Sequence, residues 1–331
     1  METRVLGRGG LEVSAVGMGC MGLSHAYGEA VDKKLAASLI AKAVDEGITL
    51  FDTAEVYGTP RDPHHNEKLV GRALAPFRDR VKIVTKFGLS FDFKSGKVPL
   101  PLVPDSRPET IRRSVEGSLQ RLGTDHIDLY FQHRQDPKIP VEEVAGVMGD
   151  LIREGKILHW GLSQAGEETL RKAHAVTPVA ALENRYSMMA RGFEELFPVL
   201  EELGVGFIAY SPLANGLLSG AYGRDSSFDP KTDYRAKMPQ FRPEAFDENR
   251  ELLALVRSVS ERTGATPAQV SLAWMLAKRP WIVPIPGMRK AERIAENAGA
   301  AALKLSPEEV AAIDRALDDM DMSGVYGVAK N

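Results

Sequence analysis

The feature that most constrains the fold of this chain is a regular alternation between short apolar runs and longer segments with helical spacing. Eight runs are apolar throughout rather than at every second residue, which is typical of strands buried on both faces. The runs are residues 15–19, 48–51, 81–85, 127–132, 157–162, 179–182, 205–210 and 281–285. Strands that are separated by helices must pair in parallel. Eight such units predict a closed (β/α)8 TIM barrel.

Local signals refine this prediction at the ends of elements. Helix starts are predicted at Ser106, ahead of Pro108, and at Ser306, ahead of Pro307. Residues 3–14 predict a short N-terminal hairpin that precedes the first barrel strand.

Length does not require a second domain. The 331 residues match two average domains, but (β/α)8 barrels often exceed ~250 residues as one unit, so we expect a single barrel domain over residues 1–331. Long stretches follow the third and the seventh predicted strand, at 88–107 and 214–245. Both begin at the strand ends where barrel enzymes carry their active sites, so we interpret them as walls or lids of a site. The alternative is a surface insertion without a role.

Four polar residues stand at or just beyond the ends of predicted strands. Asp52, Lys86 and His133 each close an apolar run, and Tyr57 follows Asp52 by five residues. Tyrosine is a weak acid with an ordinary pKa near ~10, and a lysine ammonium nearby would lower that pKa. An aspartate would keep the lysine charged, and a histidine would orient a carbonyl oxygen. The set predicts proton donation to a carbonyl, with a hydride from a bound cofactor completing the reduction.

Each of these residues has a plainer interpretation when taken alone. Asp52 could cap the next segment, Tyr57 could be a packed aromatic, and Lys86 could be a solvated strand end. His133 alone would more often be a structural histidine with satisfied hydrogen bonds. The functional interpretation depends on their joint placement at the strand ends of a barrel.

The same segments resemble the aldo-keto reductase superfamily. DTAEVYG, the lysine that ends VKIVTK, and DLYFQH are similar to the family's catalytic tetrad, which implies that Asp52, Tyr57, Lys86 and His133 are catalytic. Further matches follow in family order: GMGCMGLS, HWGLSQ, AYSPLANGLLSG and VPIPGMRKAERIAENAGA. The GCMG and IPG motifs are typical of the bacterial and plant branch. The resemblance implies an oxidoreductase that reduces an aldehyde or ketone with NADPH and without a metal.

The resemblance also implies where the cofactor binds. Tyr210 would stack on the nicotinamide, and Arg289 and Arg293 would contact the adenosine 2′-phosphate, which favours NADP over NAD. A solvated helix face is the alternative for both arginines. The implied cofactor-binding residues are Gly22, Leu23, Asp52, Ser163, Gln164, Glu183, Tyr210, Ser211, Pro212, Leu213, Gly216, Leu218, Gly287, Arg289, Arg293, Glu296 and Asn297.

Two of these positions depart from the commonest family pattern. Gln164 stands where many members have Asn, and Glu183 stands where many have Gln. A carboxylate can accept a hydrogen bond from the carboxamide NH2 but cannot donate one to its carbonyl. The carboxamide contacts are therefore the least direct inference from the resemblance.

Residues that follow the strand ends are expected to line the substrate pocket. The predicted substrate contacts are Leu23, Tyr27, Tyr57, Phe87 and His133, with His25, Arg134, Phe91 and Phe93 as further candidates. This mixture of apolar and charged groups favours an aromatic or medium-sized carbonyl compound. The choice among an aldehyde, a ketone, a sugar-derived carbonyl and a pyridoxal-like aldehyde stays open, as does the direction of the reaction.

Two other patterns are weaker. Residues 17–22 fit the glycine pattern of a Rossmann fold, but no helix opens at the third glycine, and Asp52 follows ~30 residues later instead of ~20. His64 and His65 are adjacent and so point apart, and the sequence has no HExxH motif and no cysteine cluster. We therefore predict neither a Rossmann fold nor a metal site.

Charge and cysteine content exclude several other classes of function. A net charge of -3 without a basic run argues against partners such as nucleic acid or an anionic membrane. The single cysteine, Cys20, cannot form an intrachain disulfide, and there is no signal peptide or membrane-span pattern. We expect a cytoplasmic protein whose partner is a small carbonyl compound. The sequence carries no signal for oligomeric state.

Two alternative functions remain. A barrel lyase could form a Schiff base on Lys86, although a paired Asp52 would oppose the neutral amine that this chemistry needs. An NADP-binding regulatory or redox-sensing protein with little turnover would use the same cofactor site.

Overall fold

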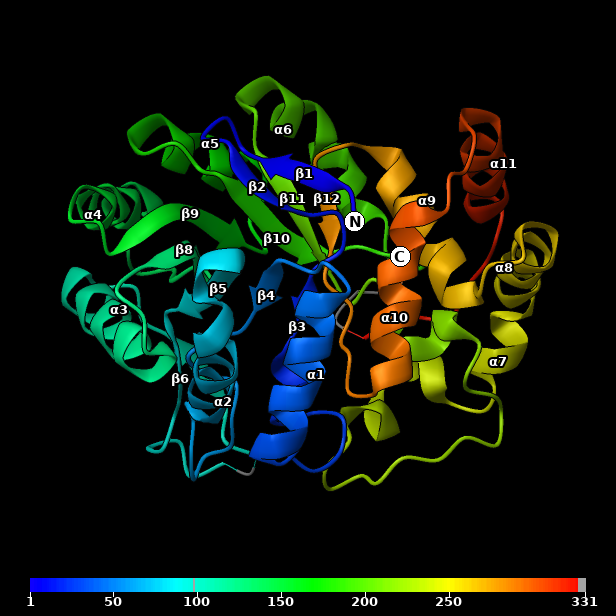
Figure 1. Ribbon diagram of the computed structural model, residues 1–331, viewed down its shortest axis with the longest axis horizontal. Helices are drawn as coiled ribbons and strands as arrows, with labels where there is room; N and C mark the ends of the chain where they lie inside the picture. The colour runs from blue at the N-terminus through cyan, green and yellow to red at the C-terminus, as the bar shows by residue number, and fades with distance from the viewer. Residues whose placement is uncertain (98, 327–331) are drawn as a thin grey trace.

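The computed structural model describes residues 1–97 and 99–326 (Figure 1). Eight parallel strands form one sheet in the order β12-β11-β10-β9-β8-β5-β4-β3. They are β3 (Met18–Gly19), β4 (Leu50–Asp52), β5 (Lys82–Phe87), β8 (Ile127–Gln132), β9 (Ile157–Ser163), β10 (Ala181–Arg185), β11 (Gly206–Tyr210) and β12 (Ile282–Pro284). The first and last strands meet where Gly17 N donates to Pro284 O at 2.9 Å and Gly19 N donates to Pro286 O at 3.1 Å. The predicted (β/α)8 barrel and its eight strands are confirmed.

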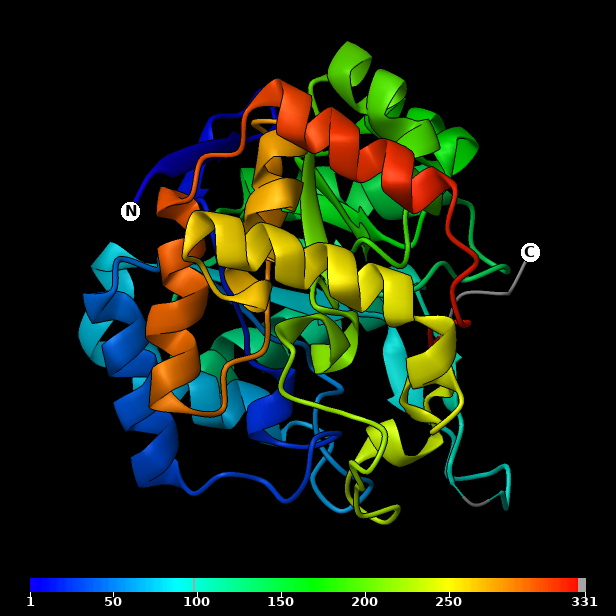
Figure 2. The same ribbon diagram turned by 90° about the vertical axis from the view of Figure 1, so that its right-hand side faces the viewer.

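Helices surround the sheet on its outer side, as Figures 1 and 2 show. They are α1 (Lys33–Asp45), α2 (His65–Leu74), α3 (Pro108–Leu122), α4 (Val141–Arg153), α5 (Glu167–Val176), α6 (Phe197–Leu203), α7 (Ala245–Glu248), α8 (Arg250–Thr263), α9 (Pro267–Lys278), α10 (Ala291–Gly299) and α11 (Pro307–Asp318). Within the described residues, none of these helices is long and apolar enough to cross a membrane.

One of the two predicted helix caps is confirmed. Ser306 accepts a hydrogen bond from Glu309 N, and the Glu309 carboxylate accepts one from Ser306 N, which forms a capping box for α11. The other predicted helix start is also met, because α3 begins at Pro108, but its N-cap residue is Arg107, which makes no side-chain cap. Ser106 is instead buried, and its hydroxyl accepts from the Gln132 amide at the end of β8 at 2.8 Å.

Alternation along the strands fills the inside of the barrel with small and medium apolar side chains. This interior cluster contains Leu50, Val84, Leu129, Phe131, Ala181, Ile208, Val283 and Ile285. Gly161 on β9 makes room for it, because a Cβ there would lie 2.3 Å from the Phe131 ring. The interior is therefore a packed core below the site and not a channel.

The predicted N-terminal hairpin is also confirmed. Strands β1 (Thr3–Leu6) and β2 (Leu11–Ser14) pair antiparallel. Leu6, Leu11 and Val13 join the interior apolar cluster, so the hairpin closes one end of the barrel.

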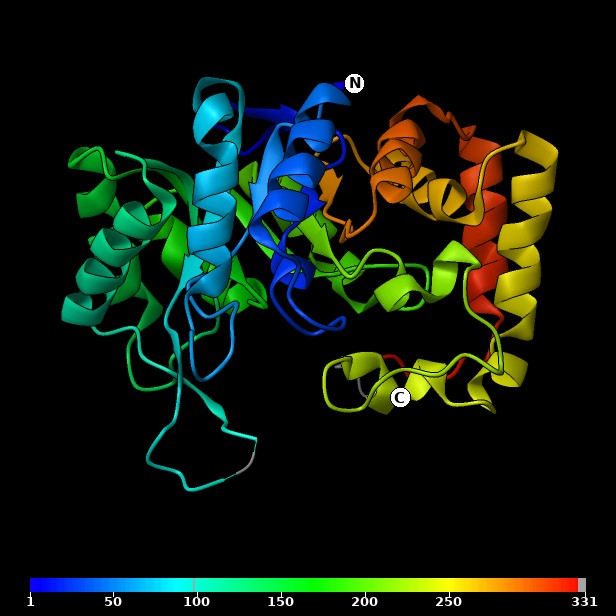
Figure 3. The same cartoon turned by 60° about the horizontal axis from the view of Figure 1, so that its bottom comes forward.

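Both long loops lie at the other end of the barrel, as Figure 3 shows. The stretch after β5 contains an antiparallel pair, β6 (Leu89–Phe91) and β7 (Leu102–Pro104), so it is more regular than its prolines indicated. The stretch after β11 contains three short 3-10 turns, Ala214–Ser219, Tyr234–Lys237 and Pro239–Phe241.

Candidate active site

Lys86 is the centre of the polar end of the barrel. Its position two residues after Val84 on β5 turns its side chain into the barrel, where it has no exposed surface. The Nζ atom donates to the Asp52 carboxylate from the neighbouring strand and to Thr53 O at 3.0 Å. It also lies 3.2 Å from Glu183 Oε1 on β10. One ammonium is therefore held between two buried carboxylates.

The charge states of this cluster follow from burial and mutual attraction. Burial favours a neutral lysine, but attraction to Asp52 and Glu183 outweighs it, so the pKa of Lys86 is raised above its ordinary value. Burial also raises the pKa of Asp52, with Lys86 opposing that shift. Burial and then repulsion from Asp52 raise the pKa of Glu183 to about 8. Lys86 therefore stays charged, and the acids compete for its single positive charge.

Tyr57 lies in the loop after β4, beside this cluster. Lys86 Nζ is 5.1 Å from the centre of the Tyr57 ring. The His133 ring meets the Tyr57 ring edge-on at 5.6 Å, and the His25 ring lies 5.9 Å away. The structure thus brings together the four residues that the sequence placed at separate strand ends.

One electrostatic prediction for Tyr57 is wrong. Burial raises the pKa of the phenol above its ordinary value. Lys86 lowers that pKa as expected, but repulsion from Asp52 and Glu183 opposes the lysine. The net shift is upward because burial outweighs the attraction of Lys86, and the two carboxylates add to the effect of burial.

His133 follows β8 and is 7% exposed. Burial, followed by repulsion from Lys86 and Arg134, lowers the pKa of His133 well below its ordinary value. Its Nδ1 is buried and has no hydrogen-bond partner in the described part of the chain. A neutral imidazole at this position can donate one hydrogen bond to a carbonyl oxygen.

The ends of β9, β10 and β11 place the predicted carboxamide and stacking residues side by side. Gln164 has a left-handed backbone (φ 55°), and its N–H donates to Asn184 Oδ1 at 2.7 Å. Its side-chain amide donates to the Tyr210 hydroxyl. Ser163 Oγ accepts a long hydrogen bond from Arg134 at 3.4 Å. These contacts fix the Tyr210 ring at the mouth of the barrel.

Arg185 is a site residue that the sequence reasoning missed. Its guanidinium lies 5.3 Å from the centre of the Tyr210 ring. It also donates to the backbone oxygen of Tyr326. The sequence feature that could have identified Arg185 is its spacing of two residues from Glu183. Two residues on one strand with this spacing point to the same side of the sheet.

The predicted pyrophosphate loop after β11 has an unusual backbone. Ser211, Asn215 and Gly216 all have positive φ angles. Pro212 and Leu218 are buried, and the Leu218 side chain belongs to the core, so only the backbone of Leu218 could contact a ligand. The Asn215 amide donates to the Tyr27 hydroxyl at 2.7 Å, which fastens this loop to the segment after β3. Tyr27 therefore packs against the loop.

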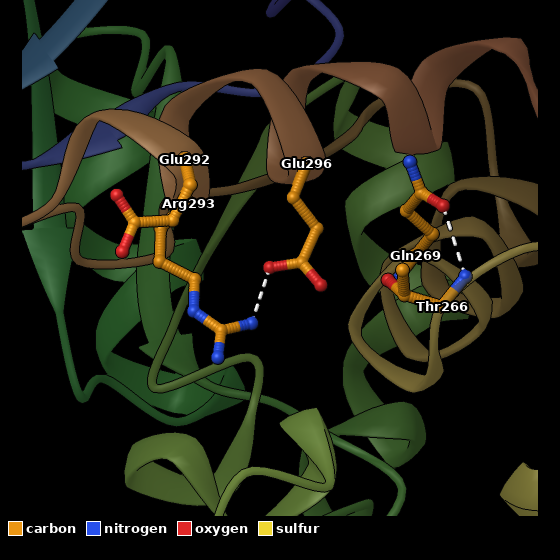
Figure 4. Close-up of a pocket in the computed structure, with 5 residues that line it drawn as sticks. All are labelled: Thr266, Gln269, Glu292, Arg293 and Glu296. Carbon is orange, nitrogen blue, oxygen red and sulfur yellow. Dashed lines mark hydrogen bonds and ion pairs between the residues drawn. The ribbon is translucent and has the colours of Figure 1, made fainter.

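The residues predicted to bind the adenosine end of the cofactor lie on α10, beside a pocket. Thr266, Gln269, Glu292, Arg293 and Glu296 line a pocket of about 420 Å³ (Figure 4). Arg293 pairs with Glu296 inside it, and Asn297 next to Glu296 has a buried Oδ1 without a partner among the described residues. Arg289 is placed differently, because its guanidinium donates to the backbone oxygens of Tyr27 and of Glu29, the latter at 2.6 Å.

Two predicted substrate contacts are wrong as side-chain contacts. Phe87 is fully buried, and its ring packs 4.9 Å from that of Tyr130. Because Lys86 points into the barrel, its neighbour Phe87 must point out toward the helices. Leu23 is 1% exposed and belongs to the same outer core.

The comparisons with known proteins agree with this arrangement. The model of the Aldo/keto reductase family matches residues 15–318. The chain belongs to the aldo/keto reductase family. This aldo/keto reductase is 39% identical over 322 residues to "Probable aldo-keto reductase 1" of Glycine max, covering 96% of the chain and 90% of the relative. Its family makes it an oxidoreductase that acts on carbonyl compounds, and members of the family generally use nicotinamide cofactors.

Solved structures of this aldo/keto reductase's relatives share its fold. A glycerol dehydrogenase from Gluconobacter oxydans superimposes with a TM-score of 0.86 at 29% identity, with 99% of each chain covered. A thermostable aldo-keto reductase in complex with the inhibitor epalrestat gives a TM-score of 0.73 at 29% identity, covering 96% of this chain and 100% of the other.

The residues present could hold a nicotinamide cofactor. Buried acceptors without a partner among residues 1–97 and 99–326 occur at both predicted ends of its site, at Glu183 Oε2 and Asn297 Oδ1. By contrast, within the described ranges this aldo/keto reductase has no group of three His, Cys, Asp or Glu residues that could hold a metal ion.

Proposed function

We propose that this aldo/keto reductase reduces an aldehyde or ketone to an alcohol with hydride from NADPH, and that Tyr57 donates the proton. The observation that carries the proposal is the fully buried Lys86, which pairs with Asp52 and lies 5.1 Å from the Tyr57 ring. A charged lysine without solvent contact is costly to bury. Stabilisation of a developing Tyr57 tyrosinate would explain why the charged Lys86 side chain is buried here.

Each of the four residues has a distinct task in this mechanism. A nicotinamide cofactor held beside Ser163, Gln164 and Tyr210 would supply the hydride that the carbonyl carbon needs. The Tyr57 phenol donates its proton to the carbonyl oxygen as negative charge develops there, and neutral His133 donates a hydrogen bond that orients this oxygen. Lys86 stabilises the tyrosinate that remains, while Asp52 keeps Lys86 charged and aimed. The raised pKa of Tyr57 suits a donor, because the phenol keeps its proton until the oxygen becomes basic.

The preference for NADP rests on Arg293. It is the cation among the residues that line the α10 pocket, and a guanidinium suits a phosphate dianion. To bind a 2′-phosphate, Arg293 would exchange its ion pair with Glu296 for the ligand.

The Schiff-base alternative is less well supported. A lysine that attacks a carbonyl must be neutral, whereas Asp52 and Glu183 raise the pKa of Lys86. No contact in the site favours amine chemistry over proton transfer.

A panel of aldehydes and ketones, followed by the loss of NADPH absorbance with NADH alongside, tests the proposal. We expect turnover with at least one carbonyl compound and its loss by about 10²- to 10⁴-fold in Tyr57→Phe, with NADPH binding retained. Full turnover in Tyr57→Phe would exclude this residue as the donor. Tight NADPH binding with no turnover on any substrate would favour a regulatory protein.

A further inference from the structure

Glu183 has one carboxylate oxygen that no described residue satisfies. Oε1 lies 3.2 Å from Lys86 Nζ, but Oε2 is buried without a hydrogen-bond partner. The residue as a whole is 2% exposed, so bulk water does not replace the missing partner. Leaving a buried polar atom without a hydrogen-bond partner in this way is unfavourable. The position therefore indicates a partner that the protein chain itself does not provide.

Among the described residues, Lys86 is the cation that pairs directly with Glu183, and Asp52 shares it. Asp52 from β4 shares the Lys86 ammonium with Glu183, and Tyr57 adds no positive charge. Arg134, which follows β8, donates to His133 O at 2.6 Å and to Ser163 Oγ. From the same strand as Glu183, Arg185 is engaged by the rings of Tyr210 and Tyr326. With both acids ionised, the Lys86 ammonium is the direct partner of two carboxylates, while Arg134 attracts Glu183 more weakly from beside this cluster.

An oxidised nicotinamide ring would bring a further positive charge to this layer. Hydride transfer needs reacting atoms about 3–3.5 Å apart. The carbonyl that accepts the hydride also meets Tyr57, and Tyr57 lies beside Lys86. The ring must therefore approach the layer that Lys86 and Glu183 share. An oxidised nicotinamide ring is cationic and a reduced one is neutral, so a carboxylate at this position interacts differently with the two states.

We propose that Glu183 discriminates between the oxidation states of the bound cofactor, stabilising the oxidised nicotinamide over the reduced one. Bound NADPH thereby becomes a stronger hydride donor, and NADP+ leaves more slowly, than in the same site with glutamine. This inference rests on the proposed use of a nicotinamide cofactor.

Protonation of Glu183 gives the proposal a second signature. Burial, followed by repulsion from Asp52, raises the pKa of Glu183 to about 8, so the free protein holds this proton at neutral pH. A cationic ring favours the carboxylate, so NADP+ binding near pH 7 would release a fraction of this proton, whereas NADPH binding would not. Because Glu183 is half ionised at its pKa of about 8, the discrimination approaches its limit at pH 9 and fades as the pH falls through 8. NADP+ and NADPH both carry the 2′-phosphate, so its contribution to binding cancels in the ratio of their dissociation constants.

The test measures the dissociation constants of NADP+ and NADPH for the wild type and Glu183→Gln between pH 6 and 9, with NAD+ and NADH alongside. Calorimetry in two buffers of different ionisation enthalpy counts released protons. We expect the ratio Kd(NADPH)/Kd(NADP+) at pH 9 to be about tenfold higher in the wild type, which corresponds to about 30 mV in the potential of the bound cofactor. Because a tenfold preference lowers the pKa of Glu183 by about one unit, NADP+ binding at pH 7 should release about 0.4 proton per site from the wild type and none from Glu183→Gln.

Glu55→Gln is the matched control. Glu55 is also buried with a raised pKa, but its carboxylate accepts from Gly88 N at 3.0 Å instead of facing Lys86. This variant should keep the wild-type ratio and the wild-type proton release. A loss of both in Glu55→Gln would mean that any buried acid has the same effect, and the proposal would be overturned.

The outcomes separate this inference from the proposed function. Equal Kd ratios in the wild type and Glu183→Gln would overturn the inference and leave carbonyl reduction intact. Absence of all nicotinamide binding to the wild type would overturn both. If Glu183→Gln does not fold, the proton count for the wild type still tests the proposal. Equal proton release on binding of NADP+ and NADPH at pH 7 would contradict it.

Discussion

Glu183 and Lys86 face each other across the inside of the barrel, with 3.2 Å between carboxylate oxygen and ammonium. Their strands, β10 and β5, are separated in the sheet by β9 and β8. Closure of the sheet therefore brings the two side chains together. Asp52 approaches the same ammonium from the adjacent strand β4, so Lys86 is the common partner of two acids.

Removal of this ammonium should destabilise the fold. Lys86→Met leaves Asp52 and Glu183 buried without a cation, and we expect a loss of about 3–5 kcal/mol in the free energy of unfolding at pH 8. The loss should shrink at pH 5, where the buried acids take up protons. Urea unfolding at both pH values measures it.

Lys82→Met on the same strand is the control for that change. Lys82 is partly exposed and lies 3.5 Å from Asp128, which keeps its 2.8 Å ion pair with Arg78. We expect this variant to lose less than about 1 kcal/mol. Similar losses in both variants would contradict the special position of Lys86.

Gly161 should tolerate no side chain. In Gly161→Ala the new Cβ would meet the Phe131 ring at 2.3 Å and Ala181 O at 2.5 Å. Such overpacking costs about 1–3 kcal/mol, and thermal unfolding should show a lower midpoint. Gly146→Ala in α4, where a Cβ meets nothing within 4 Å, should instead stabilise by about 0.5–1 kcal/mol. A neutral Gly161→Ala would show that the barrel interior can relax.

Glu55 should make stability depend on pH. Burial, followed by repulsion from Glu67, raises the pKa of Glu55 from 4.5 to about 7. The folded state then holds the proton more tightly than the unfolded chain, so the contribution of Glu55 is most favourable below pH 4.5 and declines as the pH rises to 7. We expect Glu55→Gln to remove about 1–3 kcal/mol of the decline between pH 5 and pH 8 in denaturant titrations. An unchanged pH profile would show that Glu55 is ionised throughout this range.

Arg293 should determine cofactor choice. Arg293→Ala removes the arginine from the α10 pocket, and we expect NADPH affinity to fall about 10- to 100-fold while NADH affinity changes little. Fluorescence titration measures both constants. Arg262→Ala, at an exposed arginine paired with Glu309 outside the pocket, should leave both constants unchanged. An equal loss for both cofactors in Arg293→Ala would assign the arginine a structural role.

The sequence by itself determined the strand–helix alternation, the eight barrel strands, the N-terminal hairpin and the capping box at Ser306. These features depend on residues close together in the chain, such as an apolar run or a serine three residues before a glutamate. The gathering of Asp52, Tyr57, Lys86 and His133 was also predictable, because parallel strands bring their carboxyl ends to one face of a barrel.

Only the tertiary structure decided what each inward side chain meets. In the folded protein, Phe87 points away from the pocket and packs against Tyr130, and Glu183 forms an ion pair with Lys86. Arg289 donates a hydrogen bond to the backbone of Tyr27, and burial raises the pKa of Tyr57. These outcomes depend on distances across the barrel and on desolvation, which are set by strand stagger and by residues far away in the chain. The spacing of residues along the sequence determines neither the distances across the barrel nor the desolvation of a side chain.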